Sequence, residues 1–174
     1  MRKNSAEVPQ KLTKIDIAEA ELKTAIRLFF EDTHPVPIYT LAAAAREILT
    51  TIGGRTGVRT VLHNFADRKG ISLQDAEKDI RRFVNFFKHA NRDPAAVLEN
   101  FSDLGNDILL WIASHDFGRV AGGMPIEAQV FEAWFYAITV KRVSDGGLKW
   151  QRIVKRCIQL FPGIRSSRGP SKSA

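Results

Sequence analysis

The chain has 174 residues, of which 44% are hydrophobic and 26% charged, a size and composition typical of one globular domain. Its longest apolar stretch, around residues 130–140, is interrupted by Glu132 and is shorter than the roughly 20 residues of a spanning helix. No membrane span is therefore expected. The first residues lack the apolar core of a signal peptide, and Cys157 is the only cysteine, so no intramolecular disulfide can form. Together these features predict a cytoplasmic location.

The net charge of +7 is unevenly distributed along the chain. Residues 141–174 contain nine Lys and Arg and one Asp, whereas residues 1–140 contain 17 basic and 18 acidic side chains. The body of the chain is thus nearly neutral and its C-terminal segment is strongly basic. This asymmetry favours an anionic partner such as RNA, another polyanion or an acidic protein. The alternative is a basic tail that only improves solubility.

Residues 1–12 have no hydrophobic periodicity and are predicted to be a disordered leader. A first helix then begins at Thr13, whose hydroxyl and the carboxylate of Asp16 form a capping-box pattern. After two prolines, apolar residues at helical spacing predict a second helix over residues 38–52. Gly53 and Gly54 are expected to end it, because a helix C-cap favours the left-handed conformation that glycine adopts.

The rest of the chain repeats this pattern of amphipathic segments separated by glycine and proline. A short third helix ends at Gly70, a fourth runs from Ser72 to about residue 90, and a fifth covers residues 104–120. A sixth, starting at Pro125, is apolar on nearly all sides and is expected in the middle of a bundle. A last helix is predicted over residues 148–161, before a disordered basic tail over residues 163–174. The prediction is an all-α fold, a single helical bundle of six or seven helices over residues 13–162.

The fourth helix carries a polar constellation opposite its apolar stripe. At 100° per residue, Arg82, Asn85 and His89 fall within roughly 60° of one another. An imidazole can transfer a proton near neutral pH, and a guanidinium can hold a phosphate and stabilise charge that builds up on it. These groups suit metal-independent cleavage of a phosphodiester at a ribose 2′-hydroxyl, with His89 as general acid or base, Arg82 as phosphate clamp and Asn85 as orienting group.

The pattern Arg82-x6-His89 resembles the R-x4-6-H motif of the HEPN superfamily, helical-bundle proteins that include many dimeric ribonucleases of bacterial defence and toxin–antitoxin systems. The resemblance covers this one helix and the all-α plan. It implies catalysis by Arg82, Asn85 and His89, RNA as substrate, and a homodimer through the fourth helix that doubles the site. Separately, the string NFFKHANRDP at residues 85–94 resembles a motif of uncharacterised bacterial helical proteins.

A simpler interpretation of the same residues is the solvated side of an amphipathic helix, which is the commoner meaning of such a pattern. On that interpretation the chain is a non-catalytic protein-interaction bundle. Metal binding is not predicted and no cofactor is implied, because no second ligand set has diagnostic spacing. The pairs weighed for it were Glu31 with His34, His63 with Asp67, Asp103 with Asp107, and His115 with Asp116.

The predicted last helix and the tail suggest a third function, a nucleic-acid-binding module that acts through charge alone. The helix has an apolar face and a basic face, and more arginines follow it, a combination that can track a nucleic-acid backbone or lie on an anionic membrane surface. The alternative is that the apolar face docks on the bundle while the basic groups remain in water. The residues predicted to bind nucleic acid are Lys149, Arg152, Arg156, Arg165 and Arg168.

Overall fold

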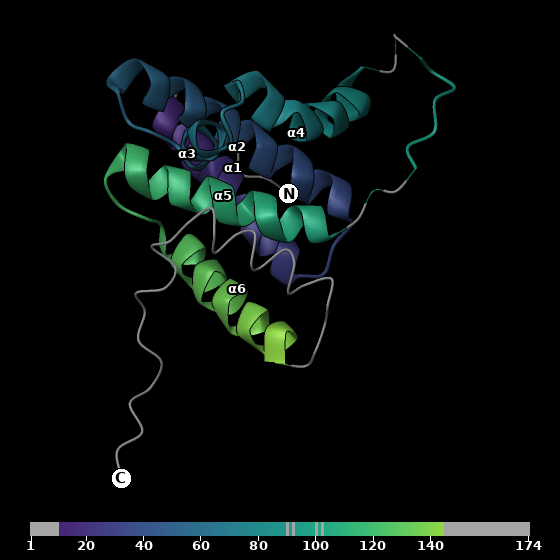
Figure 1. Ribbon diagram of the computed structural model, residues 1–174. Coiled ribbons are helices and arrows are strands. Elements are labelled where there is room, and N and C mark those ends of the chain that lie inside the picture. Colours follow the sequence, from purple (N-terminus) through teal and green to yellow (C-terminus); the bar gives the residue numbers. More distant parts are fainter. Residues whose placement is uncertain (1–10, 90, 92, 100, 102, 145–174) are drawn as a thin grey trace, which may run out of the picture.

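The computed structural model describes residues 11–89, 91, 93–99, 101 and 103–144, in which every regular element is an α-helix (Figure 1). The all-α prediction is confirmed for this part of the chain. The predicted last helix, the basic tail and the first ten residues lie outside the described residues. The six helices are α1 (Lys14–Phe30), α2 (Pro35–Thr56), α3 (Val61–Lys69), α4 (Leu73–Lys88), α5 (Leu104–Ala121) and α6 (Ile126–Ser144).

The start of α1 forms the capping box expected from its sequence. The Thr13 hydroxyl accepts a hydrogen bond from the Asp16 backbone N–H at 3.1 Å, and the Asp16 carboxylate accepts one from the Thr13 backbone N–H at 2.7 Å. The Thr13 backbone N–H and the Thr13 hydroxyl, which donates to the same carboxylate oxygen at 2.8 Å, lower the pKa of Asp16. The cap satisfies backbone donors that the first turn of a helix otherwise leaves unpaired.

The second helix is longer than predicted at both ends. It begins at Pro35, because proline in the first helical turn loses no intrahelical hydrogen bond. It continues through Gly53 and Gly54 and ends at Gly57, whose φ of 76° is left-handed. The prediction that the glycine pair ends this helix was therefore wrong. Gly53 is required by packing, since a Cβ there would lie 2.6 Å from the Val58 carbonyl oxygen.

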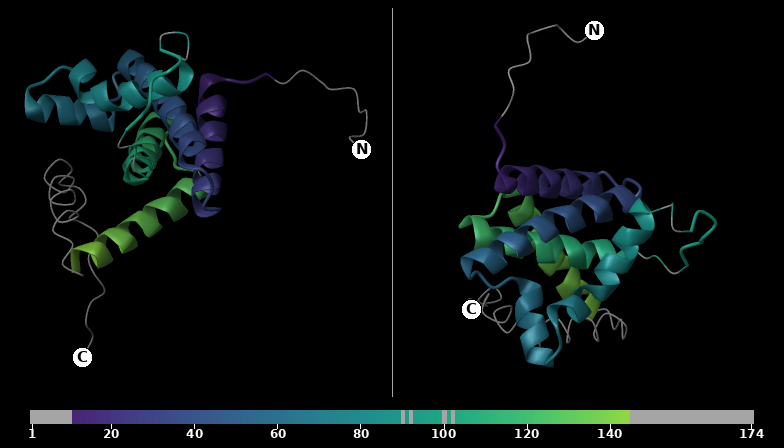
Figure 2. Two further views of the ribbon diagram at one scale, coloured as in Figure 1. Left: turned by 90° about the vertical axis from the view of Figure 1, so that its right-hand side faces the viewer. Right: turned by 90° about the horizontal axis from the view of Figure 1, so that it is seen from above.

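Three helices, α1, α2 and α5, enclose the main core. α1 and α2 form an antiparallel hairpin, and α5 runs beside α2 in the same direction (Figures 1 and 2). At the start of α5, Asn106 donates from Nδ2 to the Pro35 carbonyl at 3.1 Å. Near its other end, Asp116 accepts a hydrogen bond from the Val61 backbone N–H at 2.6 Å. The largest fully buried apolar side chains are Phe131, Leu22, Ile26, Leu49, Leu109, Leu110 and Val61.

Aromatic packing places α4 against the side of α2. The Tyr39 ring on α2 meets the Phe83 and Phe87 rings of α4 edge to face, at centroid distances of 5.6 and 5.9 Å. Phe101, just before α5, closes the cluster at 5.6 Å from Tyr39. Burial raises the pKa of Tyr39 to about 12, so its phenol stays protonated at neutral pH. These contacts cover the apolar stripe of α4, and the polar face of the helix remains exposed.

The last described helix, α6, lies on the opposite side of α5 from α3 and α4 (Figures 1 and 2). It packs only on α1 and α5 among the described helices, with Phe131 and Phe135 buried. Ile126 and Val130 remain 73% and 56% exposed. The expectation of a central position for this helix is not met in the described part of the chain, because α2 occupies that place.

Candidate functional site on α4

The three polar residues predicted on the fourth helix do share one hollow. Arg82, Asn85 and His89 are exposed and line a surface pocket of about 380 Å³. The far wall is the turn after α4, with Asp93 and Pro94. In that turn the Ala96 backbone N–H donates to the Asp93 carbonyl at 3.2 Å, so the chain folds back beside the helix end.

The two ends of α4 are fixed differently. At its start the Ser72 hydroxyl accepts from the Asp75 backbone N–H at 3.0 Å. At its end, His89 is the capping residue rather than a helical one, and its backbone N–H donates to the Asn85 carbonyl at 3.0 Å. The helix therefore ends one residue before His89 and about two residues before the predicted end. Its imidazole still joins Arg82 and Asn85 at the pocket.

An aromatic side chain completes the pocket. Phe86 is 39% exposed and lines it together with the three polar residues. The Arg82 guanidinium carbon lies 5.4 Å from the centroid of the Phe83 ring, a cation–π distance that restrains this arginine. The pocket thus offers a cation, an amide, an imidazole and an accessible ring on one short stretch of chain.

A buried ion pair holds α4 on α2. Arg46 on α2 donates from Nη1 to Glu77 Oε1 at 2.8 Å, and both side chains are 4% exposed. Arg81, one turn further along α4, donates to the other oxygen, with its Nε 2.9 Å from Glu77 Oε2. Burial alone would raise the pKa of Glu77, but the hydrogen bonds and charges of Arg46 and Arg81 outweigh it and lower the pKa. Glu77 therefore remains ionised as a bridge between two arginines.

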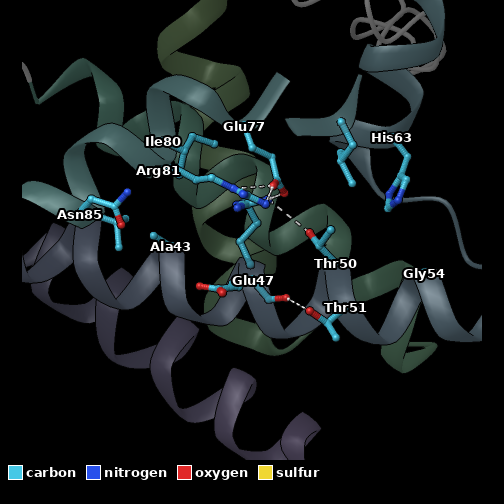
Figure 3. A pocket seen from close by; sticks show the side chains of 13 residues that line it. Ala43, Glu47, Thr50, Thr51, Gly54, His63, Glu77, Ile80, Arg81 and Asn85 are labelled. Carbon is cyan, nitrogen blue, oxygen red and sulfur yellow. Dashed lines mark hydrogen bonds and ion pairs between the residues drawn. The ribbon is translucent and has the colours of Figure 1, made fainter. Parts of the chain in front are cut away.

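This ion pair forms one wall of the second and larger hollow, about 500 Å³, between α2 and α4 (Figure 3). Arg81 points toward Glu77, while Asn85 and His63 lie at opposite ends of the view. Thr50 and Glu47 supply the α2 side. Asn85 lines both hollows, so the larger one adjoins the pocket of Arg82 and His89.

Neither member of the buried pair was selected from the sequence as a functional or structural residue, although a signal existed. Glu77 sits in the helical series Leu73, Glu77, Ile80 and Val84, and it is the charged member of an otherwise apolar stripe. Arg46 interrupts the corresponding series on α2 in the same way. A basic and an acidic residue that each occupy an apolar stripe of two different helices are candidates for a buried pair.

The His63 and Asp67 pair considered as metal ligands has other partners. His63 Nδ1 lies 2.7 Å from the Thr60 hydroxyl, and Asp67 forms an ion pair with Arg59. Among the described residues, no group of three or more His, Cys, Asp or Glu side chains lies close enough together to hold a metal ion.

A second polar cluster joins α5 and α6. His115 Nε2 lies 2.9 Å from Glu132 Oε1, and the Tyr136 hydroxyl is 3.3 Å from the same oxygen. Burial lowers the pKa of His115, and the Glu132 carboxylate offsets only part of this effect. The Trp111 ring packs on the imidazole at a centroid distance of 4.4 Å. This cluster fixes α6 against α5.

The five basic residues predicted to bind nucleic acid, Lys149, Arg152, Arg156, Arg165 and Arg168, lie outside the described residues. In the described part of the chain, no helix has the length and apolar character needed to cross a membrane. Compared with protein-family models, with curated proteins and with solved structures, the chain gives no significant match.

Proposed function

We propose that this protein acts on single-stranded RNA at the pocket of α4 and cleaves it without a metal ion. The observation that carries the proposal is that Arg82, Asn85, Phe86 and His89 line one pocket. Each has a counterpart in a nucleotide: the guanidinium for the phosphate, the ring for a base, and the amide and imidazole for the ribose and the reacting oxygens. The HEPN-like pattern of the sequence is consistent with this chemistry.

In the proposed reaction, a base removes the proton of the ribose 2′-hydroxyl and the 2′-oxygen attacks the adjacent phosphorus. The bond from phosphorus to the 5′-oxygen breaks, and that oxygen takes up a proton. The products carry a 2′,3′-cyclic phosphate and a 5′-hydroxyl. Arg82 binds the phosphate oxygens and stabilises their developing charge, and His89 transfers one of the protons.

One copy of the pocket supplies one imidazole, whereas the reaction moves two protons. A two-fold homodimer that brings two α4 helices together would place a second His89 at the shared cleft. The larger hollow, which adjoins at Asn85, would accommodate the next nucleotide of the strand.

The deciding experiment measures RNA cleavage in EDTA by wild type and His89→Ala. We expect the variant to lose cleavage by about 10²- to 10⁴-fold, the usual contribution of a general acid or base. His34→Ala is the matched control, because His34 is also exposed but lies at the start of α2. Equal folding is checked by circular dichroism, and product ends are checked for the cyclic phosphate. Equal cleavage by wild type and His89→Ala would contradict the proposal.

Arg82→Lys tests the phosphate clamp separately, since lysine keeps the charge but loses the planar fork that binds two oxygens. We expect reduced cleavage with the same product ends. If the wild-type protein is monomeric at the concentrations at which it cleaves RNA, that result would contradict the dimeric form of the site.

The basic C-terminal segment supports a second function, RNA binding without cleavage, on the basis of its charge. Such binding would weaken steeply with rising salt and would be lost in a variant that ends at Ser144. If wild type binds RNA in this way but leaves it intact in EDTA, the binding function replaces the catalytic one. A chain with no affinity for RNA would be an interaction bundle instead.

A further inference from the structure

A third hollow, unrelated to α4, lies where the α1–α2 turn meets the start of α5 and the middle of α6. It has a volume of about 280 Å³. Its walls combine three aromatic rings with two carboxylates, and no lysine or arginine lines it. The pocket is lined by Phe29, Phe30 and Trp134, by Asp32 and Asp103, and by Asn106, together with Thr33, Pro35 and Ile38.

The three rings stand nearly at right angles to one another. Phe29 meets Trp134 at a centroid distance of 4.8 Å and an interplanar angle of 72°, and Phe30 meets Trp134 at 6.0 Å and 88°. Phe29 and Phe30 are 5.5 Å apart at 79°. All three rings also pack on the buried Phe131 ring, at centroid distances of 5.3, 6.3 and 5.5 Å, so they form one fixed aromatic wall of the pocket. The faces of aromatic rings attract cations.

Three acceptor groups of this pocket lack a hydrogen-bond donor among the described residues, whereas its Thr33 hydroxyl is already paired with the Leu28 carbonyl at 3.0 Å. Asp32 and Asp103 are exposed, and neither side chain has a hydrogen bond or ion pair with another described residue. Asn106 is only 2% exposed, and its Oδ1 has no hydrogen-bond partner although its Nδ2 donates to Pro35. A buried acceptor without a donor costs stability, so an occupant that supplies an N–H would remove that cost.

The neighbouring cations of α1 do not neutralise the pocket, because they already have a partner. Arg27 Nη2 lies 2.6 Å and Lys23 Nζ 3.7 Å from the same oxygen of Glu127 on α6. The backbone N–H of Glu127, then the hydrogen bond from Arg27 and the charges of both cations, lower the pKa of Glu127, so this carboxylate stays ionised beside them. The two carboxylates of the pocket are therefore left to attract an external positive charge.

We propose that this pocket binds an organic cation with N–H donors, a primary alkylammonium or an alkylguanidinium. The charge would lie between Asp32 and Asp103, the N–H groups would reach Asn106, and the alkyl part would pack on the rings of Phe30 and Trp134. Two sources share this chemistry, a free amine and the side chain of a lysine or arginine on another polypeptide.

The test follows the Trp134 indole N–H signal of the full-length protein by NMR, assigned with Trp134→Phe, during titration at low salt. The probes are n-butylammonium, its neutral analogue n-butanol, and Nα-acetyl-lysine amide. We expect the cation to bind at least about 5-fold more tightly than the alcohol. Binding of the blocked lysine as tight as that of n-butylammonium assigns the site to a protein side chain, and binding of n-butylammonium alone assigns it to a free amine.

Charge-removing variants test the same site without disturbing the backbone. Asp32 has a φ of 52°, which asparagine tolerates, and Asp103 makes no side-chain capping bond at α5. We expect Asp32→Asn and Asp103→Asn each to weaken n-butylammonium binding about 3- to 10-fold. Asp79→Asn on α4 is the control and is expected to bind as wild type does. Equal binding of alcohol and cation, equal weakening by Asp79→Asn, or an unchanged Trp134 signal up to about 50 mM probe would overturn the proposal.

Discussion

Arg46 Nη1 and Glu77 Oε1 lie 2.8 Å apart between α2 and α4, in a place where both side chains are 4% exposed. The pair is the most buried ionic contact that joins these two helices, and the polar face of α4 depends on it for its position. Arg81 adds a second contact to Glu77, but its own side chain is 57% exposed. The two arginines therefore contribute to stability in different ways.

Glu77→Ala would leave the Arg46 guanidinium buried without its carboxylate. We expect a loss of about 3–5 kcal/mol in the free energy of unfolding, measured by urea denaturation. Arg81→Ala removes only the exposed partner and is expected to cost about 1 kcal/mol or less. The double variant Arg46→Met with Glu77→Leu should recover much of the loss, because it leaves no buried charge. Similar losses in Glu77→Ala and Arg81→Ala would contradict this account.

The environment of Asp116 predicts that the free energy of unfolding decreases as pH rises. Burial raises its pKa from 3.8 to about 7, and the hydrogen bond from Val61 and the charges of Arg46 and Arg119 offset only part of that effect. Between these two values the folded chain binds more protons at this site than the unfolded chain, so ionisation of Asp116 favours unfolding. The destabilisation grows from about pH 4 to pH 7 and is constant above.

Asp116→Asn removes this ionisation while its side-chain oxygen still accepts from Val61. Relative to wild type, the variant should gain free energy of unfolding across that window, at up to about 1.4 kcal/mol per pH unit, and show no further gain above pH 7. Urea denaturation at several pH values measures the difference. A difference that is independent of pH would mean that Asp116 is already ionised in the folded protein at acidic pH.

The sequence predicted the six described helices, apart from some of their ends, and the surface constellation, because both depend on local periodicity. Thr13, Ser72 and Gly70 marked helix ends through their own backbone preferences. Local periodicity carries no information about contacts between segments that are far apart in the sequence. Gly53 was predicted to end a helix, whereas its role depends on its close approach to Val58, which the local pattern does not reveal. The aromatic wall of the third hollow likewise joins residues from α1 and α6, whose proximity only the fold defines.

The two adjacent glycines of α2 provide a matched test of that packing argument. Gly53→Ala would place a Cβ 2.6 Å from the Val58 carbonyl oxygen, a backbone atom that cannot move without shifting the chain. We expect it to destabilise the protein by about 1–3 kcal/mol, as overpacking does. A Cβ at Gly54 meets nothing within 4 Å, so Gly54→Ala should stabilise the helix by about 1 kcal/mol. Changes of the same sign in both variants would contradict the packing role of Gly53.

Substitutions of Phe86 test RNA binding at the proposed site on α4 with little effect on folding. Its ring is 39% exposed, so Phe86→Ala should lower the free energy of unfolding far less than it lowers affinity for single-stranded RNA. Loss of a stacked base corresponds to about 1–3 kcal/mol, or roughly 5- to 150-fold in the dissociation constant. Phe86→Leu keeps the apolar volume without the ring, and it should bind RNA as weakly as Phe86→Ala. Fluorescence anisotropy with a labelled oligonucleotide measures both. If Phe86→Leu retains wild-type affinity, the side chain contributes apolar contact area and not base stacking, and the pocket is better explained as a surface for a protein partner.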